Sequence, residues 1–210
     1  GMRGALSRLR NHGSAAAVAA LSLRPSDVFI ATYPKSGTTW LQQIVHVLRG
    51  GDPAFDEISA VVPWLESAAD MGIDLDADQP GPLRAFKTHL ALPELPAGGR
   101  RIYALRDPKD VAVSFFRFFE GWMFEPGSIS LDTFVADFLI GGSRSGRYWD
   151  HLRSSWPALS RPDVLPLCYE DMRADLDGAV RRVARFVGIE DEAAVRRAID
   201  CWSQVVPDLG

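Results

Sequence analysis

A single junction between a strand, a turn and a helix constrains the fold more than any other feature of this 210-residue chain. The apolar run at 27–32 predicts a buried strand, and apolar residues at helical spacing over 41–48 predict that a helix follows it. Between them, residues 33–40 read YPKSGTTW, in which Gly37 allows close backbone approach and Lys35 adds a positive charge. Because the first N–H groups of the helix point toward this turn, the junction predicts a binding site for a phosphate-like anion.

The turn differs from the GxxxxGKS or GxxxxGKT loop of nucleotide triphosphatases. Lys35 comes two residues before Gly37, whereas the lysine of that loop directly follows a glycine. A well-capped turn with an incidental lysine is the alternative interpretation. A plain turn, however, needs neither a lysine nor two threonines beside its glycine.

The remaining chain alternates predicted strands with predicted helices. Short apolar runs predict strands at 85–88, 102–105 and 164–168. Helices are expected from Pro108 with Asp107 as the N-cap, at 131–140, at 147–159, over an apolar stripe that ends at Gly188, and at about 190–202. This alternation predicts an α/β fold with a single domain, a parallel β-sheet flanked by helices, whose ligands bind at the carboxyl ends of the strands.

Composition and charge exclude several classes of function. The 23 Lys and Arg against 27 Asp and Glu give a formal net charge of -4, without the basic field that most nucleic-acid-binding proteins use. No stretch reaches the ~20 apolar residues of a membrane span. The apolar run at 15–23 is interpreted as a helix in an N-terminal segment (1–23) that precedes a domain at 24–210. Cys168 and Cys201 form neither a disulfide framework nor a zinc motif, which favours a cytoplasmic location.

Four motifs in order resemble those of a known family. Residues 33–40 resemble the 5′-phosphosulfate loop of the cytosolic sulfotransferases, which take a sulfuryl group from 3′-phosphoadenosine 5′-phosphosulfate (PAPS). FKTHL at 86–90 resembles the family's base motif, RDPKDVAVS at 106–114 its 3′-phosphate motif, and YEDM at 169–172 a later adenosine-side motif. The likeness runs from about residue 24 to residue 188 and implies a P-loop-like sulfotransferase fold in a short, bacterial-like member.

The resemblance implies PAPS as co-substrate, adenosine 3′,5′-bisphosphate (PAP) as product, and no metal. A sulfuryl group carries one negative charge where a terminal phosphoryl carries about two, so lysines and N–H groups suffice without magnesium. The implied cofactor contacts are Lys35, Ser36, Gly37, Thr38, Thr39, Trp40, Arg106, Ser114, Tyr169 and Ser203. Ser203 departs from the family pattern, because Trp202 stands where the family has threonine.

The C-terminus is a second departure from the family. The chain ends at Gly210, before the family's Arg-Lys-Gly loop and dimer segment, which implies a fold that lacks the C-terminal portion. A truncated chain, a naturally short homologue and a protein whose catalysis has decayed all remain open.

The implied catalytic residues are Lys35, His89 and Lys87, and Arg106 is an implied cofactor contact. In-line attack on sulfur builds negative charge on the leaving phosphate oxygen, and Lys35 is placed to stabilise it. His89, with an ordinary pKa of ~6.5, suits the general base that removes the acceptor's hydroxyl proton, and the neighbouring Lys87 would lower that pKa. Arg106 is implied to hold the 3′-phosphate, although an ion pair with Asp107 or Asp110 is the alternative.

The implied acceptor is a small molecule with a hydroxyl, apolar or aromatic in character. VPWLE at 62–66 resembles a segment of the family's acceptor pocket. The implied acceptor contacts are Trp64, Leu65, Lys87, Thr88, His89 and Phe118, with ordinary core packing as the open alternative for the apolar ones. Residues 51–80 hold eight Asp and Glu and no Lys or Arg. We expect this stretch to be a long loop with a short helix near Trp64 and Leu65 that covers the acceptor side and disfavours anionic acceptors.

Two other functions stay open at this stage. A small-molecule kinase with a degenerate phosphate loop is disfavoured, because the lysine spacing is wrong and no magnesium ligands are evident. A module that binds PAPS or PAP without catalysis is consistent with the early end of the chain.

Overall fold

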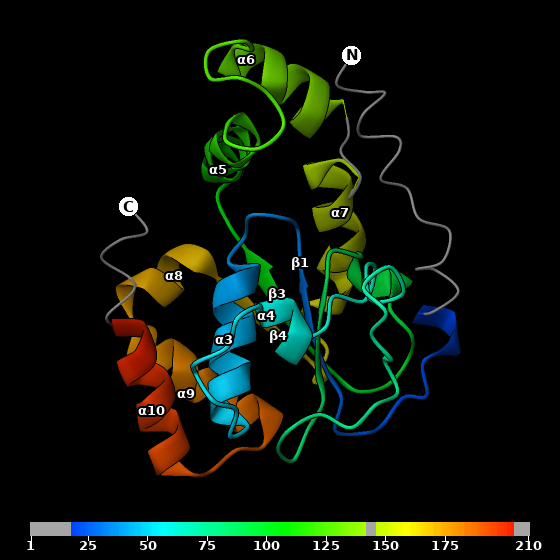
Figure 1. The fold of residues 1–210 in the computed structure, drawn as a ribbon, viewed down its shortest axis with the longest axis vertical. Coiled ribbons are helices and arrows are strands. Elements are labelled where there is room, and N and C mark those ends of the chain that lie inside the picture. The colour runs from blue at the N-terminus through cyan, green and yellow to red at the C-terminus, as the bar shows by residue number, and fades with distance from the viewer. Residues whose placement is uncertain (1–17, 142–145, 204–210) are drawn as a thin grey trace.

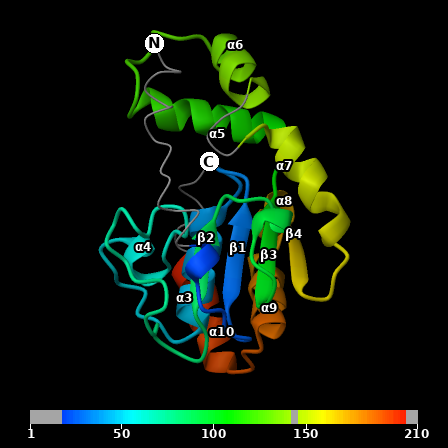
Figure 2. The same ribbon diagram turned by 90° about the vertical axis from the view of Figure 1, so that its right-hand side faces the viewer.

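The computed structural model of the protein describes residues 18–141 and 146–203, in which four parallel strands form one sheet with helices on both faces (Figures 1 and 2). The strands are β1 (Val28–Thr32), β2 (Ala85–Thr88), β3 (Arg100–Leu105) and β4 (Val164–Cys168). Their spatial order is β2-β1-β3-β4. All three pairings are parallel, so the four carboxyl ends meet at one edge of the sheet. The predicted α/β fold is confirmed.

Alternate residues of β1 face two separate cores. Val28 and Ile30 pack into the first core, and Phe29 and Ala31, on the opposite face, pack into the second. The helices of the first face are α3 (Thr38–Leu48), α9 (Leu176–Val187) and α10 (Glu192–Ser203). The second face is covered by α7 (Tyr148–Ser155) and the 3-10 helices η1 (Leu92–Glu94) and η3 (Trp156–Ala158). With both faces covered, the carboxyl edge is where a ligand can reach the sheet.

A helical arm extends beyond the carboxyl edge of the sheet (Figure 2). It consists of α5 (Pro108–Glu120), α6 (Leu131–Phe134) and the π-helical turn η2 (Val135–Ile140). Asp107 caps α5 as predicted, because its side chain accepts a hydrogen bond from the backbone N–H of Lys109. The aromatic rings of Phe115, Phe119 and Phe134 form a third core with Tyr33 from the loop after β1. This core holds the arm over the junction that the sequence singled out.

Most predicted elements agree with the structure, and three differ. The expected helix near Trp64 and Leu65 is absent from the described residues, because residues 63–65 are extended beside β2; the short helix α4 (Ile58–Val61) precedes them. The single helix expected at 131–140 is divided into α6 and η2. A short helix, α8 (Tyr169–Ala174), follows β4 directly. Of the helix expected at 15–23, residues 15–17 lie outside the described residues, 18–20 are helical, and 21–23 are not, so the helix ends earlier than expected.

A buried ion pair lies at the amino edge of the sheet. Asp27 directly precedes β1 and Arg84 directly precedes β2. The Nε and Nη2 atoms of Arg84 lie 2.8 and 2.7 Å from the two carboxylate oxygens of Asp27, and both side chains are almost fully buried. Removing one member of such a pair leaves a charge without compensation in the interior. The pair therefore joins the starts of the two strands.

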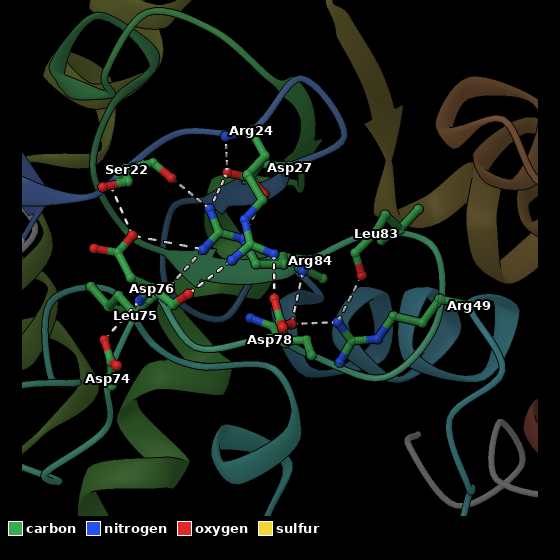
Figure 3. Close-up of polar contacts among 12 residues, drawn as sticks. Ser22, Arg24, Asp27, Arg49, Asp74, Leu75, Asp76, Asp78, Leu83 and Arg84 are labelled. Atoms are coloured by element: carbon green, nitrogen blue, oxygen red, sulfur yellow. Dashed lines mark hydrogen bonds and ion pairs between the residues drawn. The ribbon is translucent and has the colours of Figure 1, made fainter.

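The same cluster holds part of the acidic segment at this edge (Figure 3). Arg84 donates from Nη1 to the backbone oxygen of Leu75 at 3.1 Å, and Arg24 donates to the carboxylate of Asp78 at 2.6 Å. These residues thus lie at the end of the sheet opposite to the loop after β1. The expectation that the whole of 51–80 covers the acceptor side is wrong for this part, whereas residues 63–65 do lie beside the carboxyl end of β2.

Candidate functional site

The loops after β1 and β3 meet at the carboxyl edge of the sheet. The chain adds β2 on one side of β1 and β3 on the other, and open parallel sheets bind ligands where the strand order reverses in this way. Arg106, the residue after β3, donates from Nη1 to the backbone oxygen of Lys35 at 2.8 Å. The two loops that the resemblance assigned to different phosphates of one nucleotide are therefore in direct contact.

The turn after β1 has an unusual backbone that brings it close to α8. Lys35 and Gly37 have φ angles of 67° and 90°, and Gly37 is the N-cap of α3. A Cβ atom at Gly37 would lie 2.9 Å from Cδ2 of Tyr169, so only glycine fits both the conformation and the space. Thr32 and Thr38 share a short hydrogen bond between their hydroxyls, which joins the end of β1 to the start of α3. The turn is thus held from both ends.

Several polar groups around this turn are buried without a hydrogen-bond partner in the described part of the chain. They are Oγ of Ser36, Nε1 of Trp40 and Nε of Arg106. Buried polar atoms are normally hydrogen-bonded, so orphaned donors at a helix N-terminus point to a ligand that accepts hydrogen bonds. No side chain caps α3, and its first N–H groups face the same turn. This donor set fits an anionic oxygen-rich group such as a phosphosulfate.

The Lys35 ammonium group lies over an exposed aromatic ring. Its Nζ atom is 4.3 Å from the centroid of Phe118, a residue of α5 that is 48% exposed. Burial lowers the pKa of Lys35, and the charge of Arg106 lowers it further. An anion bound between the two cations would raise this pKa, because an opposite charge favours the protonated form.

His89 lies just past β2, and one of its two ring nitrogens is hydrogen-bonded within the protein. Its Nδ1 atom is 2.9 Å from the backbone oxygen of Thr32. A carbonyl can only accept, so Nδ1 carries the proton and Nε2 keeps the free lone pair that a general base needs. The ring also packs edge-on against Trp64, with centroids 5.4 Å apart.

The pKa of His89 is lowered, in the direction expected from Lys87. Burial is the largest cause and the charge of Lys87 the second, and together they bring the pKa to about 3. His89 is therefore neutral across the physiological pH range in the free protein. The hydrogen bond to the backbone of Thr32 opposes this shift only in part.

Lys87, two residues before the candidate base, contacts the acceptor-like segment. Its Nζ atom is 4.1 Å from the centroid of the Trp64 ring, and burial lowers its pKa. Its backbone pairs with residues 63–65, because Lys87 N donates to Pro63 at 2.8 Å and Leu65 N donates to Lys87 at 2.9 Å. The segment that the sequence assigned to acceptor binding is thus attached to β2 next to the candidate base.

The other candidate cofactor residues differ in how closely the structure brings them to the turn after β1. Arg106 lies over the ring of Tyr169, 4.1 Å from its centroid, and that ring packs against Trp40. In the described residues Arg106 makes no ion pair with the neighbouring aspartates, so the alternative role considered for it is not seen. Ser114 is half-buried on α5. Ser203, exposed at the end of α10, donates to backbone oxygens of its own helix.

Two of the candidate acceptor residues are fully buried. Leu65 has no exposed surface and packs in the second core, so its ordinary core role accounts for its position. Thr88 is also buried, and its hydroxyl oxygen accepts the backbone N–H of Leu90 at 3.0 Å. Of the predicted acceptor contacts, Trp64, Lys87, His89 and Phe118 retain some exposed surface at the site.

Sequence reasoning missed residues that reach the site from distant parts of the chain. Tyr148 of α7 donates from its hydroxyl to the backbone oxygen of Arg106 at 2.7 Å. Glu66 accepts the backbone N–H of His89 at 2.6 Å. A pocket of about 390 Å³ beside His89 is lined by Glu94, Asp150 and His151, among others. Only the position of Glu66 within the acceptor-like motif could have drawn attention to it.

Neither a metal centre nor a membrane span is found in what the structure describes. Within residues 18–141 and 146–203, no group of three or more His, Cys, Asp or Glu side chains could hold a metal ion. The same residues contain no helix that is long and apolar enough to cross a membrane.

Curated sulfotransferases are similar in sequence to this chain over most of its length. Sulfotransferase 1B1 of Canis lupus familiaris is 37% identical over 177 residues, which are 78% of this chain and 60% of that protein. Sulfotransferase 1E1 of Homo sapiens is 37% identical over 181 residues, 81% of this chain and 62% of that protein. The chain therefore spans roughly three fifths of the length of these relatives.

Solved structures of similar fold include proteins bound to PAP. Retinol dehydratase in complex with androsterone and the inactive cofactor PAP is 27% identical, with a TM-score of 0.74 over 90% of this chain and 67% of that chain. A putative steroid sulphotransferase of Arabidopsis thaliana is 28% identical, with a TM-score of 0.70 over 91% and 72%. The sequence model of the family described as the sulfotransferase domain matches residues 25–206 of this chain. Because that match covers most of the chain, the chain belongs to the sulfotransferase family.

Proposed function

We propose that this chain transfers the sulfuryl group of PAPS to the hydroxyl of a small-molecule acceptor, with His89 as general base and Lys35 stabilising the leaving phosphate. The observation that carries the proposal is the juxtaposition of orphaned donors at the N-terminus of α3 with a neutral histidine whose Nδ1 is committed to Thr32. A site for an anionic donor and a proton acceptor for the second substrate thus share one edge of the sheet.

In the proposed reaction, Nε2 of His89 takes the proton of the acceptor hydroxyl while the acceptor oxygen attacks sulfur. The bond between sulfur and the bridging phosphate oxygen breaks, and PAP leaves with the negative charge that this oxygen gains. Lys35 and the N–H groups at the start of α3 are placed to stabilise that charge. Two cations beside the transferred group, Lys35 and Lys87, supply what a metal ion would otherwise supply.

The nucleotide contacts are proposed from the same placement. Ser36, Gly37, Thr38 and Thr39 form the turn that holds the phosphosulfate, and Trp40 and Tyr169 border it with Arg106. Contacts of Ser114 and Ser203 with the nucleotide remain proposals that rest on the motif match. PAP in the related structures supports the same cofactor for this chain.

A neutral acceptor with an apolar or aromatic body is proposed. Trp64 and Phe118 present ring surface on either side of the two lysines. One related protein, retinol dehydratase, was solved with androsterone and with retinol, both of which carry a hydroxyl on an apolar body. The free thiols of Cys168 and Cys201 agree with the cytoplasm as the proposed location.

The test is transfer of labelled sulfuryl from PAPS to a panel of hydroxyl acceptors, combined with calorimetry of PAP, adenosine 5′-phosphate and ATP with magnesium. The proposal expects a labelled sulfate ester with at least one phenol or steroid alcohol, and a preference for PAP over ATP. Binding of PAP without any transfer would favour a non-catalytic binding module. Transfer of phosphate from ATP would contradict the proposal.

A further inference from the structure

The carboxylate of Glu66 is carried to the site by the extended segment before it. Residues 63–65 pair with Lys87 in parallel fashion, so the chain runs alongside β2 as far as its carboxyl end. Glu66 follows immediately, at the point where β2 ends and the loop that bears His89 begins. The geometry thus places an acidic side chain against the backbone of the candidate base.

The Glu66 side chain contacts consecutive residues of that loop. Its Oε1 atom accepts the backbone N–H of His89 at 2.6 Å, and the side chain of Thr88 also hydrogen-bonds to it. The hydroxyl oxygen of Thr88 in turn accepts the N–H of Leu90 at 3.0 Å. A charged acceptor strengthens such bonds relative to neutral ones. The loop is therefore held at three successive residues by one carboxylate and one hydroxyl.

This arrangement gives the imidazole two fixed points. The imidazole of His89 is fixed by the hydrogen bond from Nδ1 to the backbone oxygen of Thr32. The backbone N–H of His89 is fixed by its hydrogen bond to Glu66. We propose that Glu66 is a positioning residue for sulfuryl transfer, which keeps Nε2 of His89 directed at the acceptor hydroxyl. The proposal rests on the proposed function, because it assigns the base role to His89.

Charge supports the same role. Burial raises the pKa of Glu66, and the hydrogen bonds from His89 and Thr88 act in the opposite direction. The nearby carboxylate raises the pKa of Lys87, which burial lowers. Glu66 thus holds the base and, through its charge, favours the protonated form of the neighbouring lysine.

The test compares three variants under identical conditions. Glu66→Ala removes the acceptor of the His89 N–H, Glu66→Gln keeps an oxygen acceptor, and Asp74→Ala is the control. Asp74 likewise accepts a backbone N–H, from Asp76 at 2.9 Å, and it lies on the same acidic segment at the opposite end of the sheet (Figure 3). We expect Glu66→Ala to lower kcat about 10- to 100-fold, because small displacements of a reacting group have effects of this size. KM for PAPS and the Kd of PAP should stay within about threefold, as expected for a role confined to the transition state.

Two measurements distinguish positioning of His89 from general structural support by Glu66. They are the activity of Glu66→Gln and the tautomer of the His89 imidazole. Glu66→Gln should recover most of the activity, and Asp74→Ala should keep it. Nitrogen NMR of the labelled histidine should show Nδ1 protonated in the wild-type protein and a tautomer mixture in Glu66→Ala, a readout that does not depend on turnover. Unchanged kcat and tautomer in Glu66→Ala would overturn the proposal. An equal loss of PAP affinity and kcat would also overturn it. Wild-type protein that transfers nothing would instead refute the proposed function, while the tautomer still tests the positioning.

Discussion

Asp27→Asn should destabilise the protein severely without affecting the site. The change leaves the guanidinium of Arg84, which is 2% exposed, without its charged partner at 2.7 Å. Breaking a buried pair by removing one member typically costs about 3–5 kcal/mol. Single domains have only about 5–15 kcal/mol of stability, so the variant should fold with a much reduced margin. Asp78→Asn is the control, because its ion pair with Arg24 is solvent-exposed and should contribute less than about 1 kcal/mol.

Urea unfolding followed by tryptophan fluorescence measures this difference. With an m-value of about 2 kcal/mol/M, the Asp27→Asn midpoint should fall by about 1.5–2.5 M, and the Asp78→Asn midpoint by less than about 0.5 M. Affinity for PAP should stay near the wild-type value, because the pair lies at the amino edge and the site at the carboxyl edge of the sheet. Equal midpoints for the two variants would refute the assigned burial of the pair. A parallel loss of PAP affinity would refute the separation of the two edges.

Three further outcomes are expected. Lys35→Ala should lower the rate of transfer about 10²–10³-fold in single-turnover assays while the fold survives, and near wild-type turnover would contradict its role. Gly37→Ala should cost about 1–3 kcal/mol of unfolding free energy and weaken PAP binding, because φ is 90° and the new methyl would meet Tyr169; unchanged calorimetry and melting would refute this. In NMR titrations His89 should not protonate between pH 5 and 8, and PAP should raise its pKa by offsetting the charge of Lys87; a free-protein pKa near 6.5 would contradict its burial. Since its pKa is lowered on folding, this residue should reduce stability as pH falls from about 6.5 toward 3.

The local parts of the fold could be predicted from the sequence because their signals are local. The strands at 85–88 and 164–168 are short apolar runs, and Asp107 with Pro108 marks the start of α5 in adjacent residues. β3 begins two residues earlier than expected, since it starts with two arginines that sequence patterns assign to a loop. Arg101 is nevertheless buried, because its guanidinium pairs with Asp163 at 2.6 Å, a partner 62 positions away.

The candidate site was predictable in its motifs but not in its electrostatics. The turn at 33–40 could be recognised because its glycine, lysine and hydroxyls are consecutive. The pKa of His89 could not, because its burial and its distance to Lys87 depend on how the loop packs against Thr32 and Trp64. The extended form of residues 63–65 likewise depends on pairing with β2, so a local helix signal near Trp64 was misleading.

Single-turnover transfer by wild-type and His89→Ala protein, each saturated with PAPS, tests the central claim most directly. A general base typically contributes about 10²–10⁴-fold, so His89→Ala should transfer sulfuryl slower by that factor. The Kd of PAP should change by less than about threefold, since the base contacts the acceptor proton and not the donor. Equal transfer rates in the two proteins, or a loss of PAP affinity as large as the loss of rate, would contradict the account.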